Sequence, residues 1–211
     1  MSPDQTVHLL DDEPGMLKAL SRLLRAEGFN VRAHSSAKAF LEEFQVEEIA
    51  CLVLDVRMPG VDGLELQRRM NSLGILLPIV FLTGHGDIPM SVRAIKSGAV
   101  DFLTKPVNDT DLIRAVHAAM ERAVSGRAEI AETTTLARRF ELLTPREREV
   151  MAHVAAGKLN KQIASDLGTG EQNIKIHRSR VMRKMGMKSV AGLVRAMQRL
   201  DPGGTAETGK I

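Results

Sequence analysis

The feature that most constrains the fold is an alternation, over the first 123 residues, of five short apolar runs with helical stretches. Runs such as 51–54 and 79–82 have no charged residue, which is typical of strands buried on both faces. Strands separated by helices favour a parallel sheet with helices on both faces. The sequence therefore predicts an α/β doubly wound fold with a five-stranded parallel sheet. The expected strands are 7–10, 31–33, 51–54, 79–82 and 102–103, and the expected helices are 16–26, 37–44, 64–70, 88–97 and 111–123.

Reactive polar residues stand where four of these strands end. Asp11 and Asp12 follow the first strand, Asp55 the third, Thr83 the fourth and Lys105 the fifth. Because ligands of an open parallel sheet bind at the carboxyl ends of its strands, we expect these side chains to converge. Clustered carboxylates repel one another unless a cation lies among them, and a set of oxygen ligands favours Mg²⁺. The lysine and the threonine would hold phosphoryl oxygens, so the chemistry indicated is attack of a carboxylate on phosphorus.

Each of these residues taken alone is common at a strand end, but the ordered set is specific. Over about residues 5–123 the chain resembles the response-regulator receiver domain, a flavodoxin-like fold. The resemblance implies that Asp55 accepts a phosphoryl group. It also implies that Asp11 and Asp12 hold Mg²⁺ together with the backbone carbonyl of Arg57. Thr83 and Lys105 would contact the phosphoryl oxygens. The motifs that carry the resemblance are Asp11-Asp12, Asp55, Met58-Pro59-Gly60, Asp62-Gly63, Thr83-Gly84 and Lys105-Pro106.

The resemblance also implies a switch. Phosphorylation would draw the Thr83 hydroxyl toward the new anion, and Phe102 would turn inward, although Phe102 can also be an ordinary core residue. The face formed by the fourth helix, the fifth strand and the fifth helix would then change shape and could dimerise. Arg57 and His85 flank the site and could set the lifetime of the phosphoryl group, or could be solvated loop residues. The stretch 83–89 looks like the FixJ-type subset of receivers.

The C-terminal part of the chain differs in charge and in pattern. Residues 1–126 carry 13 Lys/Arg and 17 Asp/Glu, whereas residues 127–211 carry 16 and 9. The excess of positive charge indicates a polyanion as partner, with nucleic acid first among them. Only helical patterns follow Leu143: one helix begins with a capping box at Thr144, a second follows Asn160 as a cap, a third begins near Thr169 or Gly170 and ends at Met185, and a fourth follows Ser189.

A short Gly-containing turn followed by a basic helix is a helix-turn-helix pattern, although a basic helix of an unrelated bundle could produce it too. Over about residues 142–200 the sequence resembles the LuxR-type DNA-binding domain, on motifs such as 143–150, 160–164 and 174–178. The resemblance implies that the third helix enters the major groove and that the fourth pairs two domains. The sequence departs from the LuxR-type pattern at Gly170 and Asn173, at the start of the third helix. The implied base-facing residues are Lys175, Ile176 and Ser179; the phosphate contacts are Arg180, Lys184, Asn160, Lys161 and Asn173; and the dimerisation stripe, which can also cover the domain's own core, is Val190, Leu193, Val194 and Met197.

We therefore predict a receiver domain (1–123), a polar linker (124–141) that can continue the preceding helix at its start, an all-α four-helix helix-turn-helix domain (142–200) and a disordered tail (201–211). The partners expected are a sensor histidine kinase, promoter DNA, a second copy of the chain when phosphorylated or on DNA, and RNA polymerase. No apolar run is long enough for a membrane span, no signal peptide is evident, and a single cysteine fits a reducing cytoplasm.

Two other functions are weighed against this one. A Mg²⁺-dependent phosphatase with an aspartate nucleophile generally has a second catalytic aspartate two residues later, but here that position is Arg57. A DNA-binding protein that ignores phosphorylation would not need the complete acidic set. The sequence therefore favours a transcription regulator that catalyses only its own phosphorylation and dephosphorylation.

Overall fold

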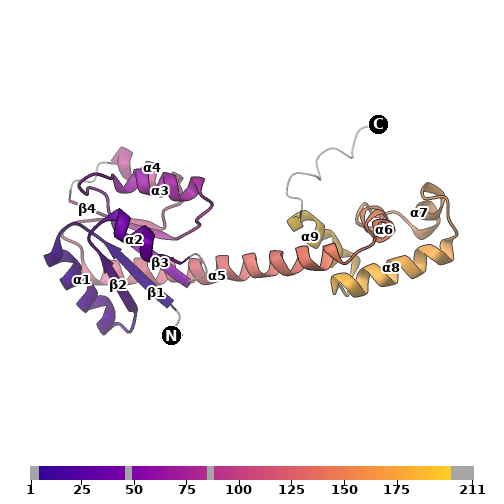
Figure 1. Cartoon of the computed structure of the whole chain (residues 1–211), viewed down its shortest axis with the longest axis horizontal. Coiled ribbons are helices and arrows are strands. Elements are labelled where there is room, and N and C mark those ends of the chain that lie inside the picture. The colour runs from indigo at the N-terminus through magenta and orange to yellow at the C-terminus, as the bar shows by residue number, and fades with distance from the viewer. Residues whose placement is uncertain (1–4, 46–48, 85–87, 201–211) are drawn as a thin grey trace. The chain divides into compact units, whose positions relative to one another are not determined.

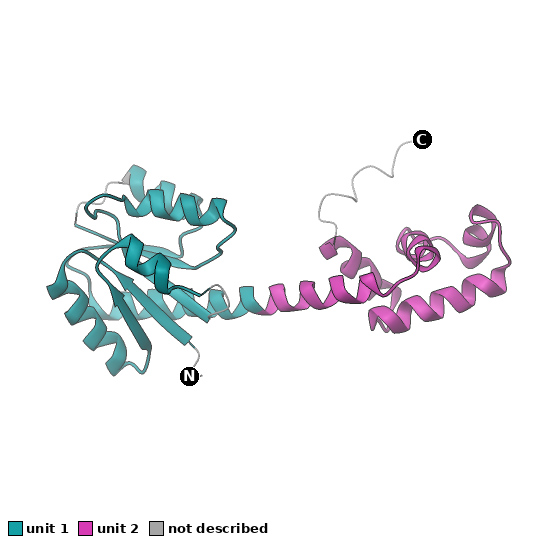
Figure 2. Cartoon of the chain, in the orientation of Figure 1, with its two compact units in different colours: residues 1–127 teal, residues 128–211 magenta. Residues whose placement is uncertain are grey.

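The computed structural model describes residues 5–45, 49–84 and 88–200, and the chain forms two compact units. Unit 1 comprises residues 1–127 and unit 2 residues 128–211 (Figure 2). The expected tail and His85 lie outside the described residues.

Unit 1 contains a parallel sheet of five strands, as predicted, and the strands lie in the order β2-β1-β3-β4-β5. Figure 1 labels four of these strands, β1 to β4. The order places β3 at the centre, between the strands that end near Asp11 and Thr83. The strands are β1 (Gln5–Leu10), β2 (Asn30–His34), β3 (Ile49–Asp55), β4 (Ile79–Thr83) and β5 (Asp101–Thr104), and the helices between them are α1 (Pro14–Ala26), α2 (Ala37–Glu43), α3 (Gly63–Ser72) and α4 (Ile88–Lys96).

Two hydrophobic cores hold the sheet between its helices. One packs alternate residues of the central strands, such as Val53 and Leu82, against α1 and the first turns of α5. The other packs the intervening residues, such as Leu54 and Phe81, against α2, α3 and α4. Alternate residues of one strand point to opposite faces, so a strand buried on both faces needs apolar residues at every position. The uninterrupted runs 51–54 and 79–82 meet that requirement.

Helix α5 (Asp109–Glu141) is longer than the sequence predicts. The segment 124–141, which we expected to be a polar linker, is helical throughout, so α5 begins in unit 1 and ends in unit 2. Serine, threonine and glycine suggested a loop there, but they are too few to end a helix whose remaining residues are good helix formers. Leu136 is 4% exposed in the core of unit 2, and this packing favours the helical state.

Unit 2 consists of the end of α5 and four further helices, α6 (Pro145–Ala155), α7 (Asn160–Asp166), α8 (Glu171–Met185) and α9 (Val190–Leu200). The capping box at Thr144 is confirmed: its hydroxyl accepts from the Glu147 N–H at 3.3 Å, and its own N–H donates to the Glu147 carboxylate at 2.9 Å. Ser189 caps α9 through the Gly192 N–H. The cap expected at Asn160 is wrong by one residue, because Asn160 is already helical and Leu159 holds the capping position.

The core of unit 2 is built from one side of each helix, with Val150, Ile163, Ile174 and Leu193 all fully buried. A small all-helical core with this connectivity confirms the predicted helical domain. Within the described part of the chain, no helix is both long enough and apolar enough to cross a membrane.

Candidate functional site

The ends of four strands bring the predicted acidic set together at one edge of the sheet. Pairing in register places Asp55 beside Leu82, one residue before Thr83, and places Thr83 beside Thr104. The backbone N–H of Lys105 then donates to the Thr83 carbonyl at 2.7 Å, which carries the lysine from the outer strand toward the centre. Parallel topology therefore assembles the site from residues that lie far apart in the sequence.

Three carboxylates form the centre of this site. Asp11, Asp12 and Asp55 each offer a ligand oxygen within 4.8 Å of the others. Asp11 is 2% exposed and Asp55 is 7% exposed, whereas Asp12 faces solvent. The Asp11 carboxylate also accepts the Glu13 N–H at 2.8 Å, so its orientation is fixed by the chain that follows it.

The Lys105 ammonium lies between the two buried carboxylates, 2.7 Å from Asp11 Oδ2 and 3.1 Å from Asp55 Oδ2. Burial lowers the pKa of Lys105, but hydrogen bonds to both carboxylates and their negative charges outweigh burial, so the pKa is raised. The lysine therefore stays charged. The cluster contains three carboxylates, two of which pair with this ammonium, and the two surplus negative charges match a divalent cation. A cluster of oxygen ligands is what Mg²⁺ prefers, so the residues fit that ion.

The backbone that follows Asp55 lies close to its side chain and to the start of α3. Arg57 is exposed, and its N–H lies 3.4 Å from Asp55 Oδ1. Gly63 begins α3 directly against the strand, and a Cβ there would lie 2.6 Å from the Asp55 backbone oxygen. Only glycine permits this close approach, so Gly63 fixes α3 beside the site.

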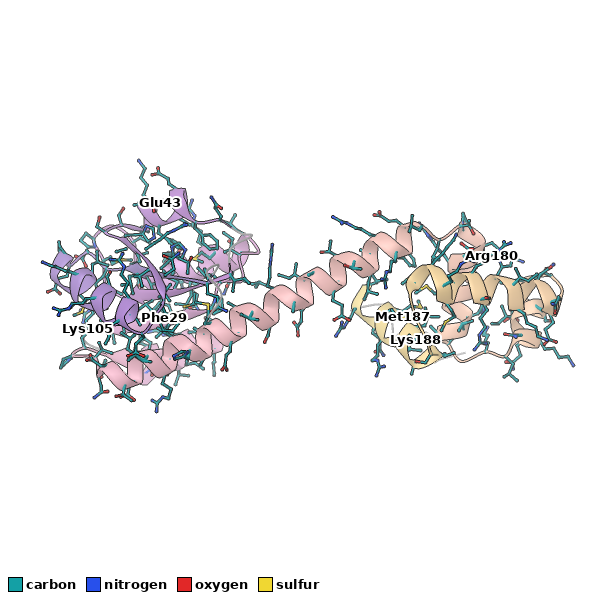
Figure 3. The ribbon with its side chains drawn as sticks, turned by 90° about the horizontal axis from the view of Figure 1, so that it is seen from below. Phe29, Glu43, Lys105, Arg180, Met187 and Lys188 are labelled. Carbon is teal, nitrogen blue, oxygen red and sulfur yellow. The ribbon has the colours of Figure 1, made fainter. Side chains whose placement is uncertain are left out.

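The two residues expected to act as a switch, Thr83 and Phe102, differ in burial. Thr83 is 1% exposed at the end of β4. Phe102 is half-buried, and its ring packs beside Phe81 with 6.1 Å between the ring centroids. His85, the second expected flanking residue, lies outside the described residues. Lys105 and, in unit 2, Arg180 are labelled in Figure 3.

In unit 2, α8 presents the expected base-facing residues to solvent. Lys175, Ile176 and Ser179 are exposed, and Ile176 retains 43% of its surface. The opposite side of the helix is buried through Ile174 and Val181. The exposed apolar side chain of Ile176 is suitable for contact with a thymine methyl group.

Three of the predicted phosphate contacts have partners within unit 2. The side-chain amide of Asn173 donates to Thr169 Oγ1 at 3.1 Å, which joins the start of α8 to the preceding turn. Asn160 Oδ1 accepts from Arg178 at 3.1 Å, so these two side chains link α7 to α8. Lys161 and Arg180 are exposed.

Lys184, the third of these residues, has a different partner from the expected one. Its Nζ donates to Glu147 Oε2 at 2.6 Å and to the Leu142 carbonyl at 3.0 Å. Glu147 is 2% exposed. Burial raises the pKa of Glu147, but the hydrogen bond and charge of Lys184, together with the bonds from Thr144, outweigh burial, so the pKa is lowered. The capping-box glutamate was visible in the sequence; its pairing across the fold with Lys184 was not.

The predicted dimerisation stripe on α9 is divided by burial. Leu193 is fully buried in the core of unit 2, and Val190 and Met197 pack against that core. Val194 is half-exposed. The stripe therefore covers the domain's own core in part, as the sequence allowed, and the surface available to a second copy is narrower than expected.

Both parts of the chain match known protein families. The family model for the response regulator receiver domain matches residues 7–117, and that for bacterial regulatory proteins of the luxR family matches residues 141–197. Together they define a class of protein in which a receiver domain, which implies a histidine kinase as partner, is joined to a domain that implies binding of DNA. This class regulates transcription and is not a metabolic enzyme.

Individual relatives match over nearly the whole chain. The response regulator protein TodT of Pseudomonas putida is 44% identical over 194 residues, 92% of this chain and 86% of TodT. The transcriptional regulatory protein FixJ of Rhizobium meliloti is 43% identical over 192 residues, 91% of this chain and 94% of FixJ. A low-resolution structure of the response regulator StyR gives a TM-score of 0.80 at 40% identity, covering 93% of this chain and 99% of StyR. The protein belongs to the response-regulator family, with a receiver domain and a LuxR-type DNA-binding domain, and its relatives are transcriptional response regulators.

Proposed function

We propose that Asp55 accepts a phosphoryl group from a histidine kinase and that this modification controls binding of promoter DNA by unit 2. Asp11, Asp12, Asp55 and the backbone carbonyl of Arg57 would hold Mg²⁺ during the reaction. The observation that carries the proposal is the approach of three carboxylates to within 4.8 Å of one another beside a single ammonium group.

The reaction transfers a phosphoryl group from an imidazole nitrogen of the kinase to a carboxylate oxygen of Asp55. A carboxylate oxygen of Asp55 attacks phosphorus, a new P–O bond forms, and the bond from phosphorus to the donor's imidazole nitrogen breaks. The imidazole leaves with the electron pair and takes up a proton. When bound, Mg²⁺ neutralises charge on the transferring oxygens. Lys105 binds another of these oxygens as its ion pair with Asp55 opens, and because its pKa is raised it does so as a cation.

The phosphoryl group then alters the surface of unit 1 through Thr83 and Phe102. The Thr83 hydroxyl donates to the new anion, and Phe102 turns inward from its half-buried position to fill the space that Thr83 vacates. The surface made by α4, β5 and α5 changes with them and pairs two copies of the chain. Light scattering with and without beryllofluoride, a mimic of the phosphoryl group, checks this step, because a dimer should form only when the mimic is present.

Unit 2 reads DNA through α8. Lys175 donates to guanine, Ile176 contacts a thymine methyl, and Ser179 lies on the same exposed face. Lys161 and Arg180 contact phosphates and position the helix without reading sequence. Two copies paired partly through Val194 would read half-sites about one helical turn apart.

The direct test of the phosphoacceptor is incubation of the full chain with acetyl phosphate, with Mg²⁺ or with a chelator, followed by mass spectrometry. One phosphoryl group should be added only with Mg²⁺, and Asp55→Asn should add none. Asp101→Asn, in an aspartate of β5 that is not part of the cluster, is the matched control and should behave as wild type. Undiminished incorporation in Asp55→Asn would contradict the proposal.

A further inference from the structure

We infer that Arg139, near the end of α5, is a positioning residue for DNA recognition, because it holds the C-terminal end of α8. The inference rests on the proposed reading of DNA by α8. It assigns to the predicted linker a part in specificity, since Arg139 lies in the segment 124–141 and outside the four helices expected to form the DNA-binding domain.

The first observation is a hydrogen bond from Arg139 to the end of α8. Arg139 Nη1 donates to the carbonyl oxygen of Met185, the last residue of that helix, at 3.1 Å. The last carbonyls of an α-helix have no partner within the helix and carry partial negative charge. A guanidinium group there satisfies one of these carbonyls and interacts favourably with the helix dipole.

The second observation is that the residue next to this guanidinium, Gly186, has no side chain. Gly186 ends α8 with φ of +69°, the left-handed conformation that favours glycine. A Cβ on Gly186 would lie 2.4 Å from Arg139 Nη1 and 2.9 Å from its Cζ. The glycine therefore both ends α8 and leaves room for the arginine head group. Met187 and Lys188, labelled in Figure 3, continue from this turn toward α9.

The third observation is that the end of α5 is itself fixed within unit 2. Leu136 is buried in the core, and Phe140 packs against it and carries the guanidinium of Arg148 over its ring at 4.9 Å. Glu132 forms an ion pair with Arg199 of α9. The last turns of α5 therefore pack as a fifth helical segment of unit 2 beside α6, α7, α8 and α9, and Arg139 extends from a fixed position.

The two ends of α8 are held in different ways. At its start, Gly170 supplies no side-chain cap, and the neutral side chain of Asn173 donates to Thr169 Oγ1 in the preceding turn. At its end, Arg139 bonds the last carbonyl and Lys184 bonds Glu147 and Leu142. The buried residues Ile174 and Val181 anchor the middle of the helix in the core. The C-terminal attachment contributes to the angle of the helix, and with it to the depth at which Lys175 and Ile176 enter a groove. Loss of the Arg139 bond should therefore impair recognition of the correct sequence more than attraction to DNA.

That distinction separates positioning from a direct phosphate contact. A lost phosphate contact weakens binding to all duplexes alike and lowers the salt dependence of binding. A lost positioning contact weakens binding to the correct site and leaves binding to unrelated DNA and its salt dependence unchanged.

The experiment uses the full chain with Mg²⁺ and beryllofluoride, and measures binding by fluorescence anisotropy over a series of salt concentrations. The probes are a duplex selected by the wild-type chain from a random-sequence pool and a scrambled duplex of the same composition. Arg139→Ala should weaken binding to the selected duplex about tenfold, the effect expected for loss of one hydrogen bond from a charged donor. Its binding to the scrambled duplex should match that of wild type. Arg139→Lys should recover most of the loss, and the exposed neighbour Arg138→Ala serves as control.

A double-mutant cycle tests the contact itself. Gly186→Ala pushes the guanidinium away, so it should impair selected-site binding in the wild-type background and have a smaller effect when Arg139 is already alanine. Strict additivity would overturn the inference, as would equal losses of Arg139→Ala on both duplexes. Lys175→Ala keeps the two proposals distinguishable: if it leaves both duplexes unaffected, the assignment of α8 fails, whereas an effect of Lys175→Ala without one of Arg139→Ala overturns only the role of Arg139.

Discussion

The acidic edge of unit 1 and the basic face of α8 are built in opposite ways. At the acidic edge, Asp11, Asp55 and Lys105 come from three different strand ends, are largely buried and contact one another. On α8, Lys175 and Ser179 come from a single helix, are exposed, and lie one turn apart. The first site exists only when the whole sheet is folded, while the second needs only a short helix held in place. The consequences of mutation should differ accordingly: loss of a reaction in one, and graded loss of affinity in the other.

The largest effect expected is the loss of phosphoryl uptake in Asp55→Asn. The amide removes the nucleophile and one of the three carboxylates, so incorporation from acetyl phosphate should fall below detection. Asp12→Asn separates the two contributions, since it keeps the nucleophile and removes an exposed ligand: phosphorylation should then need a higher Mg²⁺ concentration. An unchanged Mg²⁺ requirement in Asp12→Asn would remove that residue from the metal site.

Next in size is the effect of Lys184→Met on the stability of unit 2. This substitution leaves the buried Glu147 carboxylate without its cation, which should cost roughly 3 kcal/mol at neutral pH. Thermal unfolding followed by circular dichroism measures the loss, with the exposed neighbour Arg183→Met as control. A phosphate-binding lysine would show the reverse pattern, with weaker DNA binding and unchanged stability.

The same pair predicts a pH dependence. Because the pKa of Glu147 is lowered in the folded protein, its pair with Lys184 stabilises the fold above the ordinary glutamate pKa of about 4.3 and loses that contribution as pH falls through the lowered value. The difference in unfolding temperature between wild type and Lys184→Met should therefore be large at neutral pH and shrink in acid. A difference that stays constant would show that the lost contribution is packing and not charge.

Smaller, and confined to recognition, is the effect of Lys175→Ala. It should weaken binding to a selected duplex by ~1–3 kcal/mol and relax the preference at one base position. Its ion pair with Glu171, at 3.7 Å, is exposed, so stability should hardly change. Equal losses on selected and scrambled duplexes would move Lys175 from the base-facing to the phosphate-contacting group.

The smallest effect expected is that of Lys161→Ala, an exposed lysine in the first turn of α7. It should weaken binding to both duplexes alike and lower the slope of log affinity against log salt by about one unit. A loss restricted to the selected duplex would contradict its role as a phosphate contact.

The same contrast explains what the sequence could predict. The strands and the acidic set were predictable because continuous apolar runs end in Asp55 and Thr83, and parallel topology determines where such ends meet. The periodicity of α8 was predictable for the same reason, since a helix with one apolar side exposes the other. The pairing of Lys184 with Glu147 and of Arg139 with Met185 was not, because each joins residues 37 or more positions apart through a geometry that no local pattern encodes.

The segment 124–141 and the stripe on α9 show where prediction from the sequence fails. Thr133, Thr134 and Thr135 look like a loop by composition, yet the neighbouring Leu136 is buried and the segment is helical. Leu193 fits an apolar stripe on α9, but periodicity alone does not say whether that stripe faces its own core or a second molecule. Burial decides, and burial is a property of the whole fold.

Control of DNA binding by Asp55 can be measured as the affinity of the full chain for a selected duplex with Mg²⁺, in the presence and absence of beryllofluoride, for wild type and for Asp55→Asn. The mimic should tighten binding by wild type and leave binding by Asp55→Asn unchanged. Equal affinities in all four conditions would mean that unit 2 binds DNA without regard to the acidic site, and would contradict the proposed control of DNA binding by Asp55.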